Sequence, residues 1–454
     1  MRNIFTLFLL LIISVNLNSQ TFSINGTIEG YNNANVYLMR ILGEKQIIVD
    51  TAFTSTNGSF EFSLDNEFPM GMYAIKGGAK QIIEILYNKE NIRFVSSGTG
   101  NDDNVQIIES IENLIWYDYL YLKGLNQYKM EVIETVLFNY PDGEYLTIST
   151  EKYIQLQNHI TDRSLELAEN NPETFASRLI MVNKPNFAPF NLSNEEKQTY
   201  LIKHHFDETD FTDTLLLRSN ILNSKIVNYL SLYQRPGLTQ EQLEDRLIMA
   251  VDTVLEKALI EQDVYEFVVE FLIKGFETIG FEKGLEHIAI QNQLNDLCVN
   301  TERKAKLEDK MELIRKLSIG KVAPDFSTID INGDTIRLSE IKSEKTILVF
   351  WASWCPHCID IMPVLQEYYK PEKNDKIEIV AISIDANEQD FEEAVKTHGL
   401  NWINIAELKG WNGPIVEEYG IAATPSIFIL DKDKKILSKP TNKVKLRKEL
   451  EEEH

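Results

Sequence analysis

The spacing of apolar residues changes twice along the chain and divides it into three regions. From residue 20 to about residue 97, apolar residues occur in short alternating runs separated by turns such as Asn57-Gly58, which is typical of antiparallel strands. From about 105 to 317 they recur every three or four residues, which indicates helices. From 318 to 454, strand-like and helix-like runs alternate, as in an α/β sheet. We therefore predict a small β-sandwich-like domain, an all-α middle domain and a C-terminal α/β domain.

Individual elements can be predicted within these regions. In the first, we expect strands around residues 22–24, 36–39, 47–49, 60–64, 72–75, 82–86 and 92–95, followed by a linker at 98–104. In the helical region, one helix is predicted by the series Ile108, Ile111, Ile115 and Leu122. Thr239 and Gln242 predict the capping box of another helix. In the third region we expect strands at 346–351, 377–384 and 426–430, and helices at 358–369, 388–398 and 443–451.

Composition and charge indicate a globular protein and argue against binding to nucleic acid or anionic lipid. The chain has 454 residues, which favours more than one domain, and 43% of them are hydrophobic, as in globular proteins. Its formal net charge is −24, so phosphate backbones and anionic lipid headgroups repel it. We expect no nucleic-acid partner.

The first 19 residues predict a secretory signal peptide. Met1 and Arg2 precede an apolar run from residue 4 to 15, and the small residue Ser19 marks the expected cleavage site. The run is shorter than the roughly 20 apolar residues of a transmembrane helix. We expect the mature protein in the periplasm, with an uncleaved membrane anchor as the alternative.

The candidate chemistry lies in Cys355-Pro356-His357-Cys358, between a predicted apolar strand and a predicted amphipathic helix. This context places Cys355 at a helix N-terminus, where unpaired backbone N–H groups stabilise a thiolate. Pro356 suits the first helical turn because it has no N–H to leave unpaired. Cys358, one turn deeper, is the expected resolving thiol that breaks a mixed disulfide formed by Cys355.

The same segment allows a metal-binding interpretation and raises the question of what His357 does. Two cysteines at this spacing are also half of a zinc site, but the C-terminal region has no matching second pair, so we expect no metal. His357 favours the Cys355 thiolate if it donates a hydrogen bond toward that sulfur. A solvent-facing histidine with little effect is the alternative.

With these residues in place, the region from about 319 to the C-terminus resembles the TlpA/ResA branch of the thioredoxin superfamily. The resemblance is carried by residues 322–326 and 331–334, by Phe350-Trp351-Ala352-Ser353-Trp354-Cys355, and by Thr424-Pro425. It implies a thioredoxin-like fold and thiol–disulfide exchange without a cofactor. It also implies that Thr424 and Pro425 form the cis-proline loop that binds the substrate chain, with Trp354 beside it. Residues 20–317 resemble, more weakly, the N-terminal extensions of TlpA-like proteins of Bacteroidetes.

The chain departs from the family at the buried acid. Thioredoxins have an aspartate where this chain has Val349, and ResA-like reductases have a glutamate where it has Ile361. Asp360 is adjacent but is expected on the wrong helix face. The Pro-His dipeptide resembles that of DsbA-type oxidants, whereas the lineage favours a reductase. We expect cysteine-containing envelope proteins as substrates and a membrane thiol electron donor; a DsbA-like oxidant or isomerase and a non-catalytic copper chaperone are the alternatives.

Other residues were considered for chemistry. A peroxiredoxin also begins with the segment Ala-Pro-Asp-Phe, but its signature Pro and Thr or Ser are replaced here by Leu348 and Ala352. Cys298 is expected to be a buried helical residue rather than an intermolecular thiol. His204, His205, Asp207 and Asp210 could suggest a metal site but are expected to form a solvated helix end. Trp402 and Trp411 are expected to be packing residues of the C-terminal domain.

Overall fold

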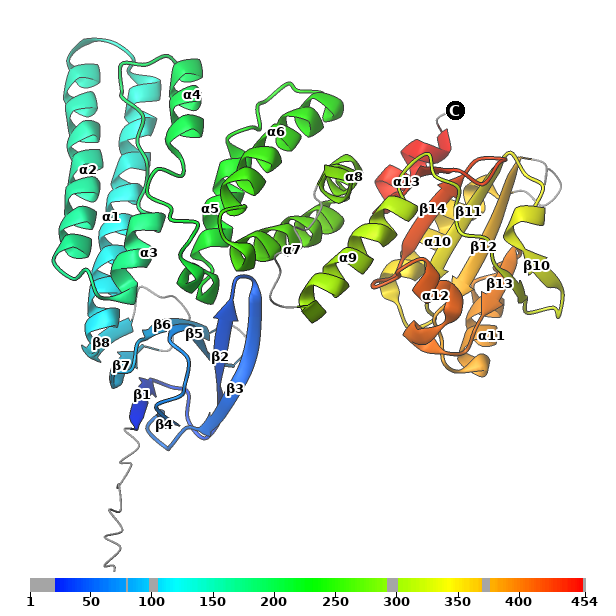
Figure 1. Ribbon diagram of the computed structural model, residues 1–454, viewed down its shortest axis with the longest axis horizontal. Coiled ribbons are helices and arrows are strands. Elements are labelled where there is room, and N and C mark those ends of the chain that lie inside the picture. The colour runs from blue at the N-terminus through cyan, green and yellow to red at the C-terminus, as the bar shows by residue number, and fades with distance from the viewer. Residues whose placement is uncertain (1–20, 79–80, 98–104, 292–300, 370–375, 452–454) are drawn as a thin grey trace, which may run out of the picture. The chain divides into compact units, whose positions relative to one another are not determined.

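The computed structural model describes residues 21–78, 81–97, 105–291, 301–369 and 376–451 (Figure 1). The predicted signal peptide, the predicted linker at 98–104 and Cys298 lie outside these residues. The chain forms two compact units, residues 1–232 and 233–454. The boundary between them falls inside the region that the sequence predicts as a single helical domain.

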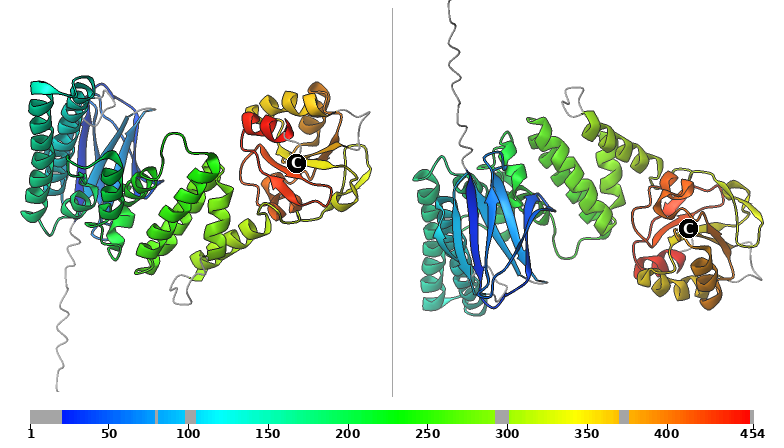
Figure 2. Two further views of the ribbon diagram at one scale, coloured as in Figure 1. Left: turned by 90° about the horizontal axis from the view of Figure 1, so that it is seen from above. Right: turned by 90° about the horizontal axis from the view of Figure 1, so that it is seen from below.

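Two four-stranded sheets begin the first unit, in the strand orders β4-β1-β7-β8 and β3-β2-β5-β6. Strands β1 and β7 are parallel, and the other neighbouring pairs are antiparallel. Figure 2 shows these sheets from two further directions. The strands are β1 (Phe22–Ile28), β2 (Asn35–Leu42), β3 (Lys45–Phe53), β4 (Ser59–Leu64), β5 (Gly71–Gly77), β6 (Gln81–Tyr87), β7 (Ile92–Ser96) and β8 (Val105–Glu109).

Alternating apolar residues of these strands form the core of the sandwich. In β1, buried and half-buried residues alternate along the whole strand, and the rings of Phe60, Phe62 and Phe94 pack edge to face. Gly26 lies beneath these rings, and an added Cβ there would be 2.2 Å from the Phe60 ring. Glycine is therefore required at this position to let the aromatic residues close over β1.

One predicted helix begins later than expected. Ile108, which the periodicity placed on that helix, lies in β8, which pairs with β7 at the edge of the sheet. The helix begins at Ile111, after Ser110, whose side chain caps the N–H of Asn113. Asn113 in turn exchanges two hydrogen bonds with the backbone of Leu86 in β6, at 2.7 and 2.8 Å. A strand followed by a helix thus gives one periodic series, although the two residues at the junction, Ile108 and Ile111, are both exposed.

Five α-helices complete the first unit. The long helices α1 and α2 are antiparallel neighbours, and α3 packs against both (Figure 1). The helices are α1 (Ile111–Asn139), α2 (Gly143–Glu169), α3 (Phe175–Asn183), α4 (Asn194–His204) and α5 (Ile221–Ser231). Buried Glu112 accepts hydrogen bonds from the N-terminal amides of Phe175 and Ala176 in α3, so a carboxylate at a helix N-terminus ties α3 to α1.

The second unit contains four helices and an α/β domain. The helices are α6 (Gln240–Ala258), α7 (Gln262–Ile279), α8 (Glu282–Gln291) and α9 (Thr301–Lys316). The predicted capping box of α6 is confirmed, because Thr239 and Gln242 bond reciprocally. Within this unit, ion pairs join α8 and α9 to the α/β domain, from Glu282 to Lys439 and from Lys316 to Glu418. None of the helices in the described residues is long and apolar enough to cross a membrane.

The α/β domain has a five-stranded mixed sheet in the order β13-β12-β11-β14-β15. Its central strand, β11, is buried throughout from Thr346 to Trp351 because helices cover both faces of the sheet. Phe350 packs on Tyr419 and Phe428, and Trp351 packs on Phe391 of α11. The elements are β9 (Ser327–Ile329), β10 (Thr335–Arg337), β11 (Lys345–Trp351), α10 (Pro356–Tyr368), β12 (Ile377–Ser383), α11 (Glu388–Thr397), β13 (Ile403–Ala406), α12 (Pro414–Glu418), β14 (Ser426–Leu430), β15 (Ile436–Ser438) and α13 (Lys443–Glu451).

A buried lysine gives a testable stability effect in the first unit. Burial and the nearby ammonium groups of Lys184 and Lys123 lower the pKa of Lys225 from 10.5 to about 8. Charging Lys225 therefore costs more in the folded than in the unfolded state. We expect Lys225→Met to raise the free energy of unfolding at about pH 7 by about 1–3 kcal/mol, measured by urea titration.

The lowered pKa of Lys225 also determines how the effect of the substitution on the free energy of unfolding changes with pH. Between about pH 8 and pH 10.5 the folded wild type loses this proton first, so its disadvantage relative to Lys225→Met should shrink across that window. Lys203→Met, which removes an exposed lysine from α4, is the control and should change little. An equal gain at about pH 7 and pH 10 would contradict the electrostatic explanation.

Candidate active site

The two predicted redox cysteines lie at the start of α10, directly after the buried strand β11. They are joined by a disulfide with a Cα–Cα distance of 5.3 Å. Pro356 occupies the first turn of the helix, where its missing N–H leaves no hydrogen bond unmade. Cys355 is 5% exposed and Cys358 is fully buried, so an incoming thiolate or disulfide can reach only the first sulfur.

The backbone around Cys355 favours negative charge on its sulfur. Cys355 is the N-cap of α10, and the backbone N–H of Cys358 donates a hydrogen bond to Cys355 Sγ at 3.2 Å. An N-terminal amide that donates to sulfur stabilises the thiolate over the thiol, and the helix dipole adds to this effect. Once the disulfide is opened, the charge on Cys355 has a donor already in place.

The residues around the pair are exposed. Trp354 is 60% exposed, and Pro356 and His357 are also on the surface. Within the described part of the chain no hydrogen bond joins His357 to Cys355 in the disulfide form, and the side chain of His357 is exposed. These three exposed residues flank Cys355 in the sequence: Trp354 precedes it, and Pro356 and His357 follow it.

A loop from the other end of the domain lies against the cysteines. The Thr424–Pro425 peptide bond is cis, as the resemblance implied. The carbonyl oxygen of Thr424 lies 3.5 Å from Cys355 Sγ, and both loop residues are half-buried. The loop leads into β14, which pairs with β11, so the sheet fixes its position beside the active-site turn.

Sequence reasoning missed a buried carboxylate that supports this turn. Asp385 follows β12, is 2% exposed, and accepts hydrogen bonds from the backbone N–H and the hydroxyl of Ser353 and from the hydroxyl of Ser383. Ser353 is two residues before Cys355, so Asp385 fixes the path of the chain into α10. The available signal was the end of β12: polar residues that follow a central parallel strand lie at the active edge of the sheet.

The positions of the family's buried acid are apolar in three dimensions as well as in sequence. Val349 is fully buried and Ile361 is 4% exposed, both within the core of the domain. Asp360 is exposed on the surface of α10. No carboxylate among the described residues hydrogen-bonds to either cysteine, so the proton of Cys358 has no fixed side-chain acceptor there.

The remaining candidates lie away from the cysteine pair. His204 bonds Asp207 at 2.7 Å, whereas the neighbouring His205 contacts the carbonyl oxygen of Lys225, so the two rings do not converge. Burial lowers the pKa of His205 to about 4. Trp402 is buried in the α/β core, and Trp411 is 43% exposed. In the described parts of the chain, no group of three or more metal-ligating side chains is arranged to hold an ion.

Three domain families match successive parts of the chain. The model described as the AhpC/TSA family matches residues 319–439. Models of two domains of unknown function, DUF4369 and DUF5106, match residues 22–114 and 161–316. The matched C-terminal segment contains the cysteine pair and the cis-proline loop.

Characterised relatives are similar over about a quarter of this chain. The thiol-disulfide oxidoreductase ResA of Bacillus thuringiensis subsp. konkukian is 35% identical over 122 residues, which are 27% of this chain and 69% of that protein. The protein of the same name from Bacillus subtilis is 27% identical over 121 residues, or 27% of this chain and 66% of the relative.

Solved structures from Bacteroides are also similar. The thioredoxin domain of a thiol-disulfide oxidoreductase from Bacteroides vulgatus is 27% identical and covers 30% of this chain and 96% of its own, with a TM-score of 0.28. A thioredoxin-like protein from Bacteroides caccae is 18% identical and covers 59% of this chain and 96% of its own, with a TM-score of 0.44.

Removing the buried carboxylate tests its support of the active-site turn. We expect Asp385→Ala to lower the free energy of unfolding by about 3–5 kcal/mol, because it leaves the amide of Ser353 and two hydroxyls buried without their charged acceptor. Asp433→Ala, which removes an exposed carboxylate from the β14–β15 turn, should cost less than about 0.5 kcal/mol. Equal urea midpoints for the two variants would show that Asp385 does not support the turn.

Proposed function

The chain belongs to the ResA-like thiol–disulfide oxidoreductases of the thioredoxin superfamily, and on that basis we propose that it is an exported disulfide reductase. Its substrates are cysteine-containing envelope proteins, and Cys355 and Cys358 are its redox pair. The observation that carries this proposal is the placement of Cys355 Sγ, which accepts an amide hydrogen bond at the N-terminus of α10 and lies 3.5 Å from the carbonyl oxygen before a cis-proline.

The reaction begins from the reduced pair. The Cys355 thiolate attacks one sulfur of a substrate disulfide, which forms a mixed disulfide and releases the other substrate sulfur as a thiolate. Cys358 then loses its proton, and its thiolate attacks Cys355 Sγ. This step closes the Cys355–Cys358 disulfide and releases the second substrate thiolate. The substrate has gained two electrons, and two protons complete its thiols.

The cis-proline loop orients the substrate in this scheme. Thr424 and Pro425 present backbone carbonyl and amide groups beside the exposed side of Cys355. A cysteine-containing segment that pairs with this loop as a short extended strand brings its sulfur in line with the attacking sulfur. Trp354 and Pro356 cover the other side with apolar surface.

The proton of Cys358 follows a different route from that in relatives with a buried acid. Because Val349 and Ile361 provide no carboxylate, we infer that the substrate thiolate released in the first step takes the proton of Cys358 before Cys358 attacks Cys355 Sγ. Resolution should be faster for substrates whose leaving thiol has a low pKa, since that thiolate is the better leaving group.

The direction of electron transfer and the cellular location of the protein are proposed on separate grounds. The reductase direction is supported by the membership in the ResA-like family, and a membrane thiol donor would return two electrons to the Cys355–Cys358 disulfide after each turnover. The Pro-His dipeptide supports the opposite direction, because it resembles that of DsbA-type oxidants. Export to the periplasm is supported by the apolar N-terminal run and its cleavage site at Ser19.

Trapping the mixed disulfide tests the division of labour between the cysteines. We expect Cys358→Ala to accumulate covalent adducts with disulfide-containing envelope proteins, because the resolving thiolate is absent. The measurement is non-reducing electrophoresis followed by mass spectrometry of the attachment site, which should be Cys355.

The matched control is Cys355→Ala, which leaves only the fully buried sulfur of the redox pair; with Cys298→Ala present in both variants, it should trap nothing. In an insulin-reduction assay driven by dithiothreitol, both variants should lose at least about 100-fold of the wild-type rate. Adducts on Cys358, or undiminished insulin reduction by Cys355→Ala, would contradict the proposed roles.

A further inference from the structure

The distal half of the α1–α2 hairpin leaves an apolar face uncovered. The last buried residue of α1 is Met130, and the first buried residue of α2 is Ile160. Between these two residues no side chain of either helix is fully buried, although Phe190, from the segment before α4, packs on Tyr153 of α2. Helices normally bury such a face against another element.

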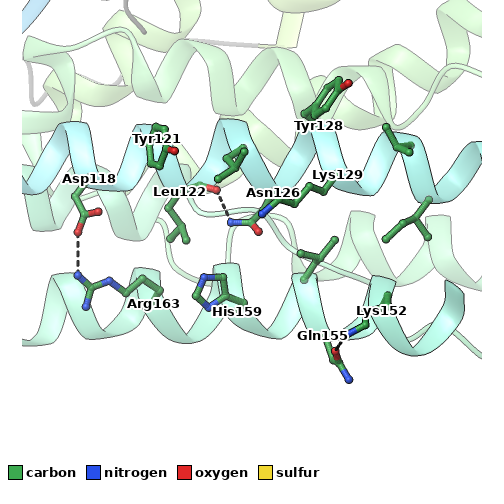
Figure 3. Close-up of a pocket in the computed structure, with 14 residues that line it drawn as sticks. Asp118, Tyr121, Leu122, Asn126, Tyr128, Lys129, Lys152, Gln155, His159 and Arg163 are labelled. Carbon is green, nitrogen blue, oxygen red and sulfur yellow. Dashed lines mark hydrogen bonds and ion pairs between the residues drawn. The ribbon is translucent and has the colours of Figure 1, made fainter. Parts of the chain in front are cut away.

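A groove runs along this hairpin between the two helices (Figure 3). It has a volume of about 840 Å³, and its α1 wall carries Tyr121, Leu125, Tyr128 and Val132. These side chains are 38–70% exposed, although they are large and apolar or aromatic. A contiguous exposed patch of this kind marks an interaction site on a monomer.

The spacing of the groove residues fits a helical partner. The α1 positions recur at intervals of four, three and four residues, and the α2 wall carries Lys152, Leu156, His159 and Arg163 at the same intervals. The α2 wall is mainly basic, with Leu156 as its one apolar residue among these four, so the two walls together form a partly apolar seam into which the side chains of a third helix can insert. From Tyr121 to Val132 the α1 wall is about 17 Å long, which matches about three turns of a partner helix.

The charged residues that line the groove indicate the charge expected of the partner helix. Its one carboxylate, Asp118, is already paired with Arg163 at 2.9 Å. The ammonium group of Lys152 bonds only the neutral Gln155, and Lys129 makes no ion pair within the described residues. Both lysines are exposed. The groove is thus locally basic on a chain of net charge −24, which is complementary to an acidic partner.

A second copy of the chain fits this groove less well. A twofold pairing of two hairpins would place the same basic residues of both copies, Lys129 and Lys152, in one interface without acidic partners. The one carboxylate of the groove, Asp118, cannot offset this, because it is paired with Arg163 of its own chain.

We propose that the groove between α1 and α2 binds an acidic amphipathic helix of a partner protein. The apolar stripe of that helix packs on Leu125, Tyr128 and Leu156, and its flanking carboxylates pair with Lys129 and Lys152. The site is independent of the cysteine pair and gives the first unit a role in selecting which protein is brought to the enzyme.

A synthetic helix tests this assignment on the full chain. The probe is a fluorescein-labelled 21-residue peptide of three heptads, with Leu at the two core positions and Glu on both flanks, which also prevents the peptide from pairing with itself. Fluorescence anisotropy should show binding that is at least about tenfold tighter than that of the same peptide with Lys on both flanks. Raising the salt concentration should weaken the binding.

Matched variants locate the binding. Leu125→Asp and Lys152→Glu should each weaken binding of the acidic peptide, by at least about tenfold and about threefold respectively. Phe138→Asp alters an 85% exposed apolar residue of the same helix outside the groove and should leave binding within about twofold. Circular dichroism should show unchanged helicity for all three, since each replaced side chain is exposed.

Three results would overturn the proposal. Equal binding of the Glu and Lys peptides would show that the groove does not prefer an acidic helix. No binding of either peptide at about millimolar concentration would show that the groove does not bind a helix of this kind. A dimer in light scattering that Leu125→Asp converts to a monomer would show that a second copy occupies the groove.

Discussion

The chemistry of this protein depends on holding one sulfur at the N-terminus of one helix. Cys355 accepts the amide hydrogen bond of Cys358 at the first turn of α10, and three other parts of the domain keep it there. The buried strand β11 delivers the chain to the turn, Asp385 fixes Ser353 just before it, and the cis-proline loop closes its open side. Each support comes from a different strand of the sheet, so the redox site requires the whole α/β domain to be folded.

Because Val349 and Ile361 occupy the two positions where the family has a buried acid, the electrostatics of the cysteine pair depend on the helix N-terminus and its surroundings. Where related proteins have a carboxylate, Val349 and Ile361 complete an apolar core, which gains packing but removes an acceptor for the proton of Cys358. The amide at the helix N-terminus favours the thiolate of Cys355 alone. The two cysteines therefore have different environments. Cys355 is accessible and stabilised as a thiolate, whereas Cys358 is surrounded by apolar side chains.

Most of the redox site could be predicted from sequence because its signals are local. The buried run before Cys355, Pro356 in the first turn and the Thr424–Pro425 pair each lie within a few residues of the feature they specify. Asp385 could not be found in this way, since its partner Ser353 is 32 residues away and only the sheet brings them together. In the first unit, strand β8 was missed because its apolar residues continue the helical spacing of α1. The exposed stripe of α1 was missed for the opposite reason: periodicity identifies apolar helix faces but does not show which one is covered.

The reduction potential of the Cys355/Cys358 pair, measured by equilibration in glutathione buffers, tests the central claim most directly. A disulfide reductase fed by a membrane thiol donor should have a potential near or below about −250 mV. A potential near or above about −150 mV would identify an oxidant or isomerase instead, and a pair that forms no reversible disulfide would contradict the enzyme assignment itself.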